Sequence, residues 1–227
     1  MYKRQTDDSE TATVNGKTLK VGQMKKIDGK KVRILGFNHD ELVDPSAYGT
    51  TTLTGKAGIS FEYVDFLTSA QMNSSDTSSG GWNSSELRRT LNGTTYNSLS
   101  IKSNIKKVKK DYIPTYDVAS TQKTEDYLWL LSCGEIWDNG YNGGVTRGKA
   151  ITTEGKQYKY YKINLEHTNY SSSNDITRKP SVSISNLWLL RSPHSDGGGS
   201  FCAVTSDGRG AGNYAGRSSG VAPGFSI

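Results

Sequence analysis

Cysteine and histidine are the residue types best able to act as nucleophiles or metal ligands, and this chain contains few of either. Its 227 residues include two cysteines, Cys133 and Cys202, and three histidines, His39, His167 and His194. The cysteines form no Cys-x-x-Cys pair, and the histidines lie far apart, without the spacing of a zinc site. We therefore predict no metal, no cofactor and no catalytic dyad at either cysteine.

Sequence motifs of common enzyme classes are also missing. The chain has no Gly-x-Ser-x-Gly nucleophile elbow and no His-Glu-x-x-His zinc motif. The three glycines at 197–199 lack the Gly-Lys-Ser/Thr ending of a phosphate-binding loop. The sequence therefore favours a binding protein over an enzyme.

Residues 138–143 read Asp-Asn-Gly-Tyr-Asn-Gly and superficially resemble a calcium loop. Gly140 occupies the third position, and Lys149 occupies the twelfth, where an EF-hand needs a bidentate Glu. Residues 137–139 also contain the residue types of the Trp-Asn-Asp motif at the calcium site of sugar-binding C-type lectins, but in altered order and without a Glu-Pro-Asn or Gln-Pro-Asp partner. We therefore predict a turn that binds no calcium.

The whole chain has a formal net charge of +6 at pH 7, and five of its lysines lie in one short stretch. Apolar residues at 101, 105 and 108 recur there at helical spacing, which predicts a solvated helix face beside a buried seam. The stretch lacks the interleaved aromatic residues on which nucleic-acid bases stack, so we predict no nucleic-acid partner. Its lysines are Lys102, Lys106, Lys107, Lys109 and Lys110.

Length and composition indicate a single domain. The chain has 25 glycines, and its 13 Tyr, 5 Phe and 4 Trp can fill a core. No apolar run approaches the roughly 18 residues of a membrane span, so we predict none. We expect a disordered tail over residues 1–12, in which 1–5 read as translation of a sequencing adapter, and one domain over 13–227.

The elements expected around these residues are mostly short strands. Asn15-Gly16 and Asp28-Gly29 predict hairpin turns. Alternating apolar residues over 59–63 predict a half-buried strand, and the apolar run at 127–131 predicts a buried one. Segments 187–191 and 221–227 are expected to be core strands, with Trp188 and Phe225 buried.

Two helices are expected, near residues 84–92 and 98–108. Asn83 and Glu86 have the spacing of a capping box before the first helix. Ser132 and Glu135 have the same spacing before a further short helical turn. The predicted fold class is therefore α+β, a mostly antiparallel sheet with about two helices.

Residues 194–220 have an unusual composition, with 8 Gly and 5 Ser in 27 positions. The segment contains no Lys, Glu, Gln, Met or Trp, although these five types make up 39 of the 227 residues. Randomising both adenines of an AAC codon can never produce those five residue types. An ordinary Gly/Ser-rich loop could lack them too, but the absence of all five types over 27 positions favours codon diversification over an ordinary loop. Asp207-Gly208 predicts a hairpin turn inside the segment.

Several motifs, in order along the chain, resemble a domain-of-unknown-function family that is common in gut bacteria and their phages. They include Gly36-Phe37-Asn38-His39-Asp40, Met72-Asn73-Ser74, Gly80-Gly81-Trp82, Leu91-Asn92-Gly93, Trp188-Leu189-Leu190-Arg191-Ser192-Pro193 and Gly220-Val221-Ala222-Pro223-Gly224-Phe225. The resemblance implies a C-type-lectin-like fold, related to formylglycine-generating enzymes. Many such proteins resemble the variable proteins of diversity-generating retroelements, which display randomised residues near the C-terminus for ligand binding.

This resemblance predicts a variable surface over residues 194–220 that binds a protein or glycan ligand, at a bacterial surface, in secreted form or on a phage virion. A non-variable carbohydrate-binding or structural surface module is the alternative. A formylglycine-generating-type enzyme is a weaker rival, because such enzymes use a closely placed cysteine pair with copper and the two cysteines here are 69 residues apart. The expected ligand-binding residues are His194, Ser195, Asp196, Gly198, Ser200, Phe201, Cys202, Arg209, Gly210, Asn213, Tyr214, Arg217 and Ser218.

Overall fold

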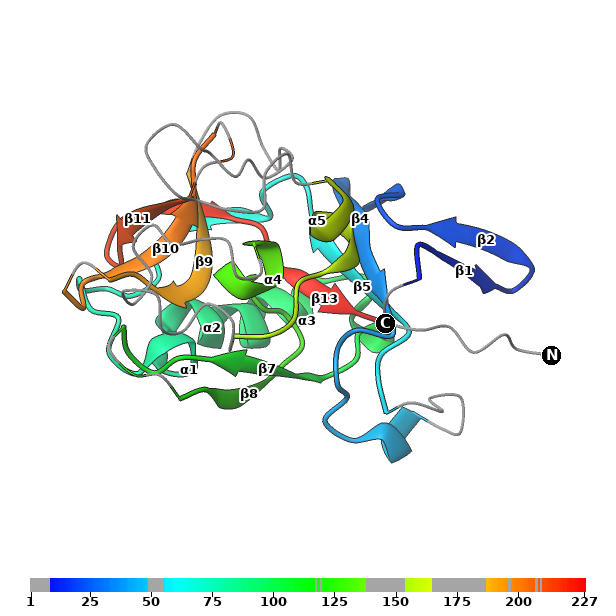
Figure 1. Ribbon diagram of the computed structural model, residues 1–227, viewed down its shortest axis with the longest axis horizontal. Coiled ribbons are helices and arrows are strands. Elements are labelled where there is room, and N and C mark those ends of the chain that lie inside the picture. The colour runs from blue at the N-terminus through cyan, green and yellow to red at the C-terminus, as the bar shows by residue number, and fades with distance from the viewer. Residues whose placement is uncertain are drawn as a thin grey trace.

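Two consecutive hairpins begin the fold in the computed structural model (Figure 1). The strands are β1 (Thr11–Val14) and β2 (Lys17–Lys20), then β3 (Met24–Ile27) and β4 (Lys30–Phe37). Both turn residues of each hairpin have positive φ, at 50° and 75° for Asn15 and Gly16 and at 48° and 79° for Asp28 and Gly29. Both predicted turns are therefore confirmed. The first strand begins at Thr11, inside the stretch expected to be a tail.

The structure describes residues 9–48, 55–116, 118, 120–137, 154–164, 187–195, 197–206, 208 and 210–227. Within these ranges it is an α+β fold with mostly antiparallel sheets and few helices. No helix of the described part is long and apolar enough to cross a membrane.

A four-stranded antiparallel sheet has the order β13-β5-β4-β3, with β5 at Ile59–Tyr63 and β13 at Gly224–Ser226. All five residues of β5 are buried, so the prediction of a half-buried strand was wrong. The polar residues of β5 lie inside because they have buried partners. Glu62 pairs with Arg33 and accepts a hydrogen bond from the Tyr161 hydroxyl at 2.6 Å. Tyr161 comes from helix α5 (Lys159–Asn164).

A five-stranded sheet has the order β11-β10-β9-β12-β6, with a parallel contact between β9 and β12 and antiparallel pairing elsewhere. Its strands are β6 (Thr68–Ala70), β9 (Trp188–Pro193), β10 (Ser200–Val204), β11 (Gly210–Tyr214) and β12 (Ser219–Val221). Strands β9 and β10 are buried along their whole length, and β11 forms the edge.

The C-terminal segment connects the two sheets. The expected strand at 187–191 is confirmed as β9, but 221–227 is not one strand. Val221 ends β12 in the five-stranded sheet, and Gly224 begins β13 in the four-stranded sheet. Trp188 and Phe225 are buried, as predicted.

The helical segment is short and irregular. It comprises α1 (Gly81–Ser84), α2 (Glu86–Thr90), a π-helical turn at Leu91–Thr95 and α3 (Tyr96–Ser98). The helix expected at 84–92 is confirmed in outline. However, its cap is Ser85, whose hydroxyl accepts a hydrogen bond from the Arg88 N–H at 3.2 Å, and not Asn83.

The helix expected at 98–108 is wrong. A short 3-10 turn at Lys102–Asn104 leads into strand β7 (Val108–Tyr112), which pairs with β8 (Gln122–Asp126). Every second residue of β7 is buried, as in a strand with one buried face. The helical spacing of the apolar positions 101, 105 and 108 does not reveal this period of two. One of the three buried residues of β7 is a lysine, Lys110, which no hydrophobic pattern could have placed inside.

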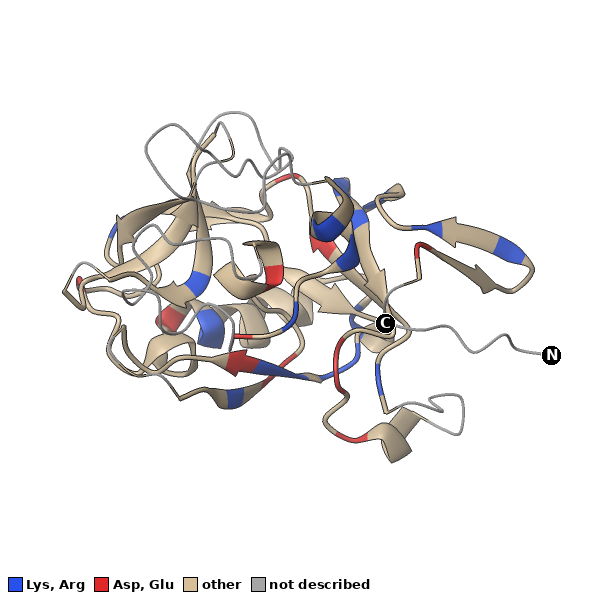
Figure 2. Cartoon of the chain, in the orientation of Figure 1, with Lys and Arg blue, Asp and Glu red and all other residues tan. Residues whose placement is uncertain are grey.

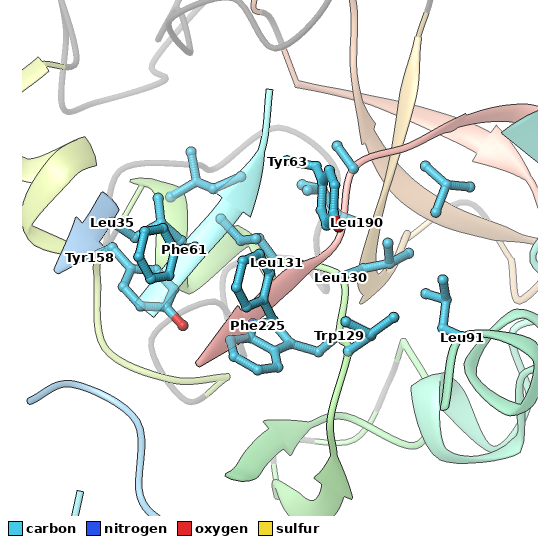
Figure 3. Close-up of a cluster of buried hydrophobic side chains, with 14 of the residues drawn as sticks. Leu35, Phe61, Tyr63, Leu91, Trp129, Leu130, Leu131, Tyr158, Leu190 and Phe225 are labelled. Carbon is cyan, nitrogen blue, oxygen red and sulfur yellow. The ribbon is translucent and has the colours of Figure 1, made fainter. Parts of the chain in front are cut away.

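The core lies where the two sheets, the helices and the chain at 127–131 meet (Figure 3). Phe61 and Phe225 stack with ring centroids 5.2 Å apart. Segment 127–131 enters this core, but only Trp129 makes a bridge, to Gly224, so the buried strand expected there is an extended segment. It leads into α4 (Cys133–Trp137), where the capping box is confirmed: the Glu135 N–H donates to the Ser132 hydroxyl at 3.0 Å, and the Ser132 N–H donates to Glu135 at 3.1 Å.

Candidate functional site

One exposed part of the C-terminal segment is the end of edge strand β11 and the turn after it. Tyr214 is exposed over 46% of its surface, and the Arg217 guanidinium lies 4.7 Å from the centre of its ring. Asn213 donates from its amide to the Arg217 carbonyl at 3.4 Å and to the Ser219 hydroxyl at 3.0 Å. We call Asn213, Tyr214, Arg217 and Ser218 the C-terminal edge. These four side chains combine an aromatic ring, a cation and small polar groups at a sheet margin.

The backbone of this turn is held by a loop that lies far away in the sequence. The Ala215 carbonyl accepts hydrogen bonds from the Met72 and Asn73 N–H groups at 2.9 and 3.0 Å. The Gly216 N–H donates to the Asp76 carboxylate at 2.9 Å. Loop 72–79 therefore supports the C-terminal edge, and exposed Asp76 lies directly beside it. Sequence reasoning missed this role, although Met72-Asn73-Ser74 was among the motifs of the resemblance.

Loop 72–79 is itself fixed to the helical segment. The Asn73 side chain accepts a hydrogen bond from the Glu86 N–H at 3.0 Å and donates to the Thr77 carbonyl at 2.7 Å. The Ser78 N–H donates to the Gly198 carbonyl at 2.7 Å. The supporting loop is therefore part of the folded scaffold.

Three of the predicted ligand-binding residues are buried, which corrects the expectation that residues 194–220 form one exposed face. Ser200, Phe201 and Cys202 belong to β10 and are at most 1% exposed. Strand β10 lies between β9 and β11 and is buried at all five positions, so these side chains contribute to the core. The Cys202 thiol lies 3.7 Å from the Pro193 carbonyl oxygen. Ser200, Phe201 and Cys202 therefore cannot contact a ligand in this fold.

The remaining predicted residues are distributed around the edge. A Cβ atom at Gly212 would lie 2.9 Å from the His194 ring, so the ring of partly buried His194 covers β11 at that point. Ser195, Gly198 and Gly210 are partly exposed. Asp196 and Arg209 lie outside the described residues, as does the turn expected at 138–143. Gly208 has φ 87° within the β10–β11 connection, as the predicted hairpin requires.

The two cysteines are both free and buried. Cys133 begins α4, where its N–H donates to the Ser192 hydroxyl at 2.9 Å. Cys202 lies in β10. A buried thiol is inaccessible to solvent, which disfavours the redox and nucleophilic chemistry that exposed cysteines perform.

A second group of polar residues is buried in the centre of the fold. Lys110 is 3% exposed, and its ammonium contacts Asp40 at 2.7 Å, the Tyr158 hydroxyl at 3.0 Å and the Glu135 carboxylate. This corrects the solvated position predicted for Lys110, whereas the other four lysines of the run are exposed or partly exposed. Burial raises the pKa of Asp40, but Lys110 and His39 outweigh it, so the net pKa lies well below its usual range.

Arg191, from the Leu-Leu-Arg-Ser-Pro motif, extends this network. Its guanidinium contacts Glu135 at 2.6 Å and donates to the carbonyls of Leu130, Asp111 and Glu154 at 2.7, 2.8 and 3.0 Å. One buried cation therefore joins α4, β7 and the chain at 130 and 154. Such charges are retained inside proteins when they are paired and hydrogen-bonded, and this one organises the scaffold.

Glu154 lies at the border of the network, and its pKa is shifted upward, whereas the pKa of Asp40 is shifted downward. Burial raises its pKa to about 7, and the opposing effects of Arg191 and Ser192 are smaller. Its carboxylate accepts a hydrogen bond from the Ile113 N–H at 3.0 Å. Glu154 is therefore the buried carboxyl group here that changes its charge near neutral pH.

Comparison with known proteins places this arrangement in a family. A family model described as a domain of unknown function, DUF6273, matches residues 49–227. No curated protein and no solved structure matches the chain. The matched range contains strands β5 to β13, and so includes the C-terminal edge, the loop that supports it and most of the buried network. Because the match covers well over half of the chain, this protein belongs to the DUF6273 family.

Proposed function

We propose that this protein is a non-enzymatic ligand-binding module with a C-type-lectin-like fold, and that the C-terminal edge is its recognition surface. The observation that carries the proposal is the exposed pair of Tyr214 and Arg217, with the guanidinium 4.7 Å from the ring centre. Tyrosine and arginine are enriched among residues that dominate binding energies at protein interfaces. Here both lie at the margin of a sheet whose interior is buried.

The composition around the pair supports recognition of a large ligand. Strand β11 reads Gly-Ala-Gly-Asn-Tyr, and Ser218 is exposed in the turn that follows. Antibody binding loops use the same combination, in which Ser, Gly and Asn adapt their hydrogen bonds around a few rigid aromatic anchors. The Tyr214 side chain loses little conformational entropy on binding, because it has only two side-chain torsion angles.

The division between scaffold and surface also supports the proposal. Stability comes from buried β9 and β10 and from the Arg191 network, none of which needs the side chains of the C-terminal edge. The edge backbone is held by hydrogen bonds from loop 72–79 to Ala215 and Gly216. A surface supported in this way can change its side chains at little cost to folding.

We further propose that the edge is, or descends from, the variable region of a diversity-generating retroelement. Asn213, Tyr214, Arg217 and Ser218 are all residue types that randomised AAC codons produce. The absence of Lys, Glu, Gln, Met and Trp from 194–220 agrees with this origin. The ligand would then be a protein or glycan met at a bacterial surface, by the secreted protein or by a phage virion.

Two display libraries test the recognition surface. The first randomises the four positions of the C-terminal edge, and the matched control randomises Ser200, Phe201, Cys202 and Val204 of β10. We expect the first library to be displayed in folded form at nearly the parental level and to yield binders to an immobilised probe protein such as lysozyme. We expect most of the β10 library to be lost, because its positions are buried. Equal loss of both libraries would show that the edge is structural.

The gene neighbourhood tests the diversification separately. A near-repeat of the 3′ end of the gene beside a reverse-transcriptase gene is the expected finding. If the complete neighbourhood lacks both, the diversification is contradicted, and a non-variable binding module remains. The library result stands in either case, because it measures the tolerance of the surface and not its history.

A further inference from the structure

A small polar cavity of about 230 Å³ opens beside β7 and β8. None of its lining residues belongs to the C-terminal edge or to loop 72–79. Figure 2 shows the contrast between the two regions, because β7 and β8 carry many charged residues whereas β10 and β11 carry none. The cavity therefore presents a cluster of lysine and carboxylate side chains, which the proposed recognition surface lacks.

Backbone hydrogen bonds fix the walls of the cavity. Glu41 and Lys56 form an antiparallel bridge, and the Ala57 N–H donates to the Asp40 carbonyl at 2.9 Å. The Lys109 N–H donates to the Glu41 carbonyl at 2.8 Å. The segment at 39–41 is thus held between the chain at 55–57 and β7, and the lysines of both neighbours line the same space.

The floor of the cavity is the buried group of Asp40, Lys110 and Glu135. Lys110 has three N–H groups, and its contacts with Asp40, Glu135 and the Tyr158 hydroxyl use all three. Both carboxylates are neutralised by cations, since Glu135 also pairs with Arg191. Among the described residues, no group of three His, Cys, Asp or Glu side chains could hold a metal ion. The floor therefore does not attract a cation.

The rim supplies hydrogen-bond donors. Lys109 contacts Glu41 at 2.5 Å, and Lys123 contacts Glu41 at 3.1 Å and Asp111 at 3.6 Å. Each ammonium carries three N–H groups, so both lysines can still donate to a ligand in the cavity. Their side chains are 32% and 52% exposed, which leaves them reachable from solvent.

The charge of the lining favours an anion. Five lysines and four carboxylates line the cavity, and each carboxylate has a lysine partner among them. His39 also lines it, with its ring stacked on Tyr158 at 4.0 Å. Burial is the largest effect on the pKa of His39 and lowers it, so at neutral pH the ring is uncharged and can both donate and accept a hydrogen bond.

We propose that this cavity binds an anionic monosaccharide, with Lys109 and Lys123 contacting its carboxylate or phosphate group and His39 contacting a ring hydroxyl. The volume is below the roughly 300–1,000 Å³ typical of drug-sized ligands, which restricts the occupant to about the size of one sugar. The binding site is separate from the C-terminal edge, so either can exist without the other.

Isothermal titration calorimetry of the full chain tests this proposal with four probes: glucuronate, glucose 6-phosphate, glucose and inorganic phosphate. We expect one or both anionic sugars to bind with a dissociation constant below about 1 mM. Glucose and inorganic phosphate should bind at least tenfold more weakly, and added salt should weaken binding of the anionic sugars. A difference between the two anionic sugars identifies which anionic group is preferred.

Lys109→Gln and Lys123→Gln should each weaken binding severalfold, whereas Lys17→Gln, at an exposed lysine of β2, is the matched control and should have no effect. Amide chemical shifts of residues 39–41 and 109–111 should move on titration with the sugar that binds. No saturable binding of either anionic sugar would overturn the proposal. Equal weakening by Lys17→Gln, or equal binding of inorganic phosphate, would also overturn it.

Discussion

Glu154 provides a test of the buried network. The sign of the change in stability with pH distinguishes a Glu154 that burial keeps protonated from one that is ionised and paired with Arg191. Its pKa is about 7 in the folded protein, against 4.5 for an ordinary glutamate, and burial is the main cause. The folded state therefore binds the Glu154 proton more tightly than the unfolded state does. As pH rises from about 4.5 through about 7, this difference lowers the free energy of unfolding.

The magnitude follows from the two pKa values. Each tenfold change in proton affinity corresponds to about 1.4 kcal/mol, so the full penalty is about 3 kcal/mol, and most of it develops between pH 5 and pH 8. Glu154→Gln removes the titration and keeps an oxygen that can accept the Ile113 N–H. The stability of the variant relative to the parent should therefore rise by about 2–3 kcal/mol between pH 5 and pH 8.

Urea unfolding at pH 5 and pH 8 measures this difference. Glu125→Gln, at an exposed glutamate, is the matched control for the loss of one surface carboxylate. If Glu154 were instead ionised and paired with Arg191 in the folded state, the variant would lose stability relative to the parent as pH rises. That opposite sign would refute the reasoning from burial.

Two further predictions concern the scaffold and the proposed surface. Phe201→Ala should lower the free energy of unfolding by about 3–5 kcal/mol, because the ring is fully buried. Tyr214→Ala should change it by no more than about 0.5 kcal/mol, because the ring is exposed. Urea unfolding of both variants measures the two changes. Asn92→Ala should cost about 2–3 kcal/mol in thermal unfolding, because the side chain accepts hydrogen bonds from the Tyr127 and Leu128 N–H groups at 2.6 and 3.2 Å and donates to the Leu128 carbonyl at 2.9 Å. A loss for Tyr214→Ala as large as that for Phe201→Ala would contradict the division between scaffold and surface, and a neutral Asn92→Ala would contradict the anchoring role of this amide.

The buried charges show why part of the candidate site was inaccessible to sequence reasoning. Lys110 was predicted on a solvated helix face, because lysines are mostly exposed and the apolar residues around it have helical spacing. In the structure it is inside, where Asp40, 70 positions earlier, and Glu135, 25 positions later, neutralise it. No local pattern encodes such a partnership, since its members come from different elements.

The C-terminal segment shows the same limit. Its composition set 194–220 apart as a candidate surface, and Tyr214, Arg217 and Ser218 are exposed as expected. However, composition could not separate Phe201 from Tyr214, because both are aromatic residues in Gly/Ser-rich surroundings. Their difference in burial comes from sheet order: β10 lies between two strands, and Tyr214 ends the strand at the edge.

What the sequence by itself determined were features whose causes lie within a few residues. The Asn15-Gly16 and Asp28-Gly29 turns need positive φ, and the capping box of Ser132 and Glu135 needs only the spacing of one helical turn. The tertiary structure alone decided that β7 is a strand, that Lys110 is buried and that loop 72–79 supports the C-terminal edge. Each of these depends on contacts between residues far apart in the chain, whose energies local propensity does not contain.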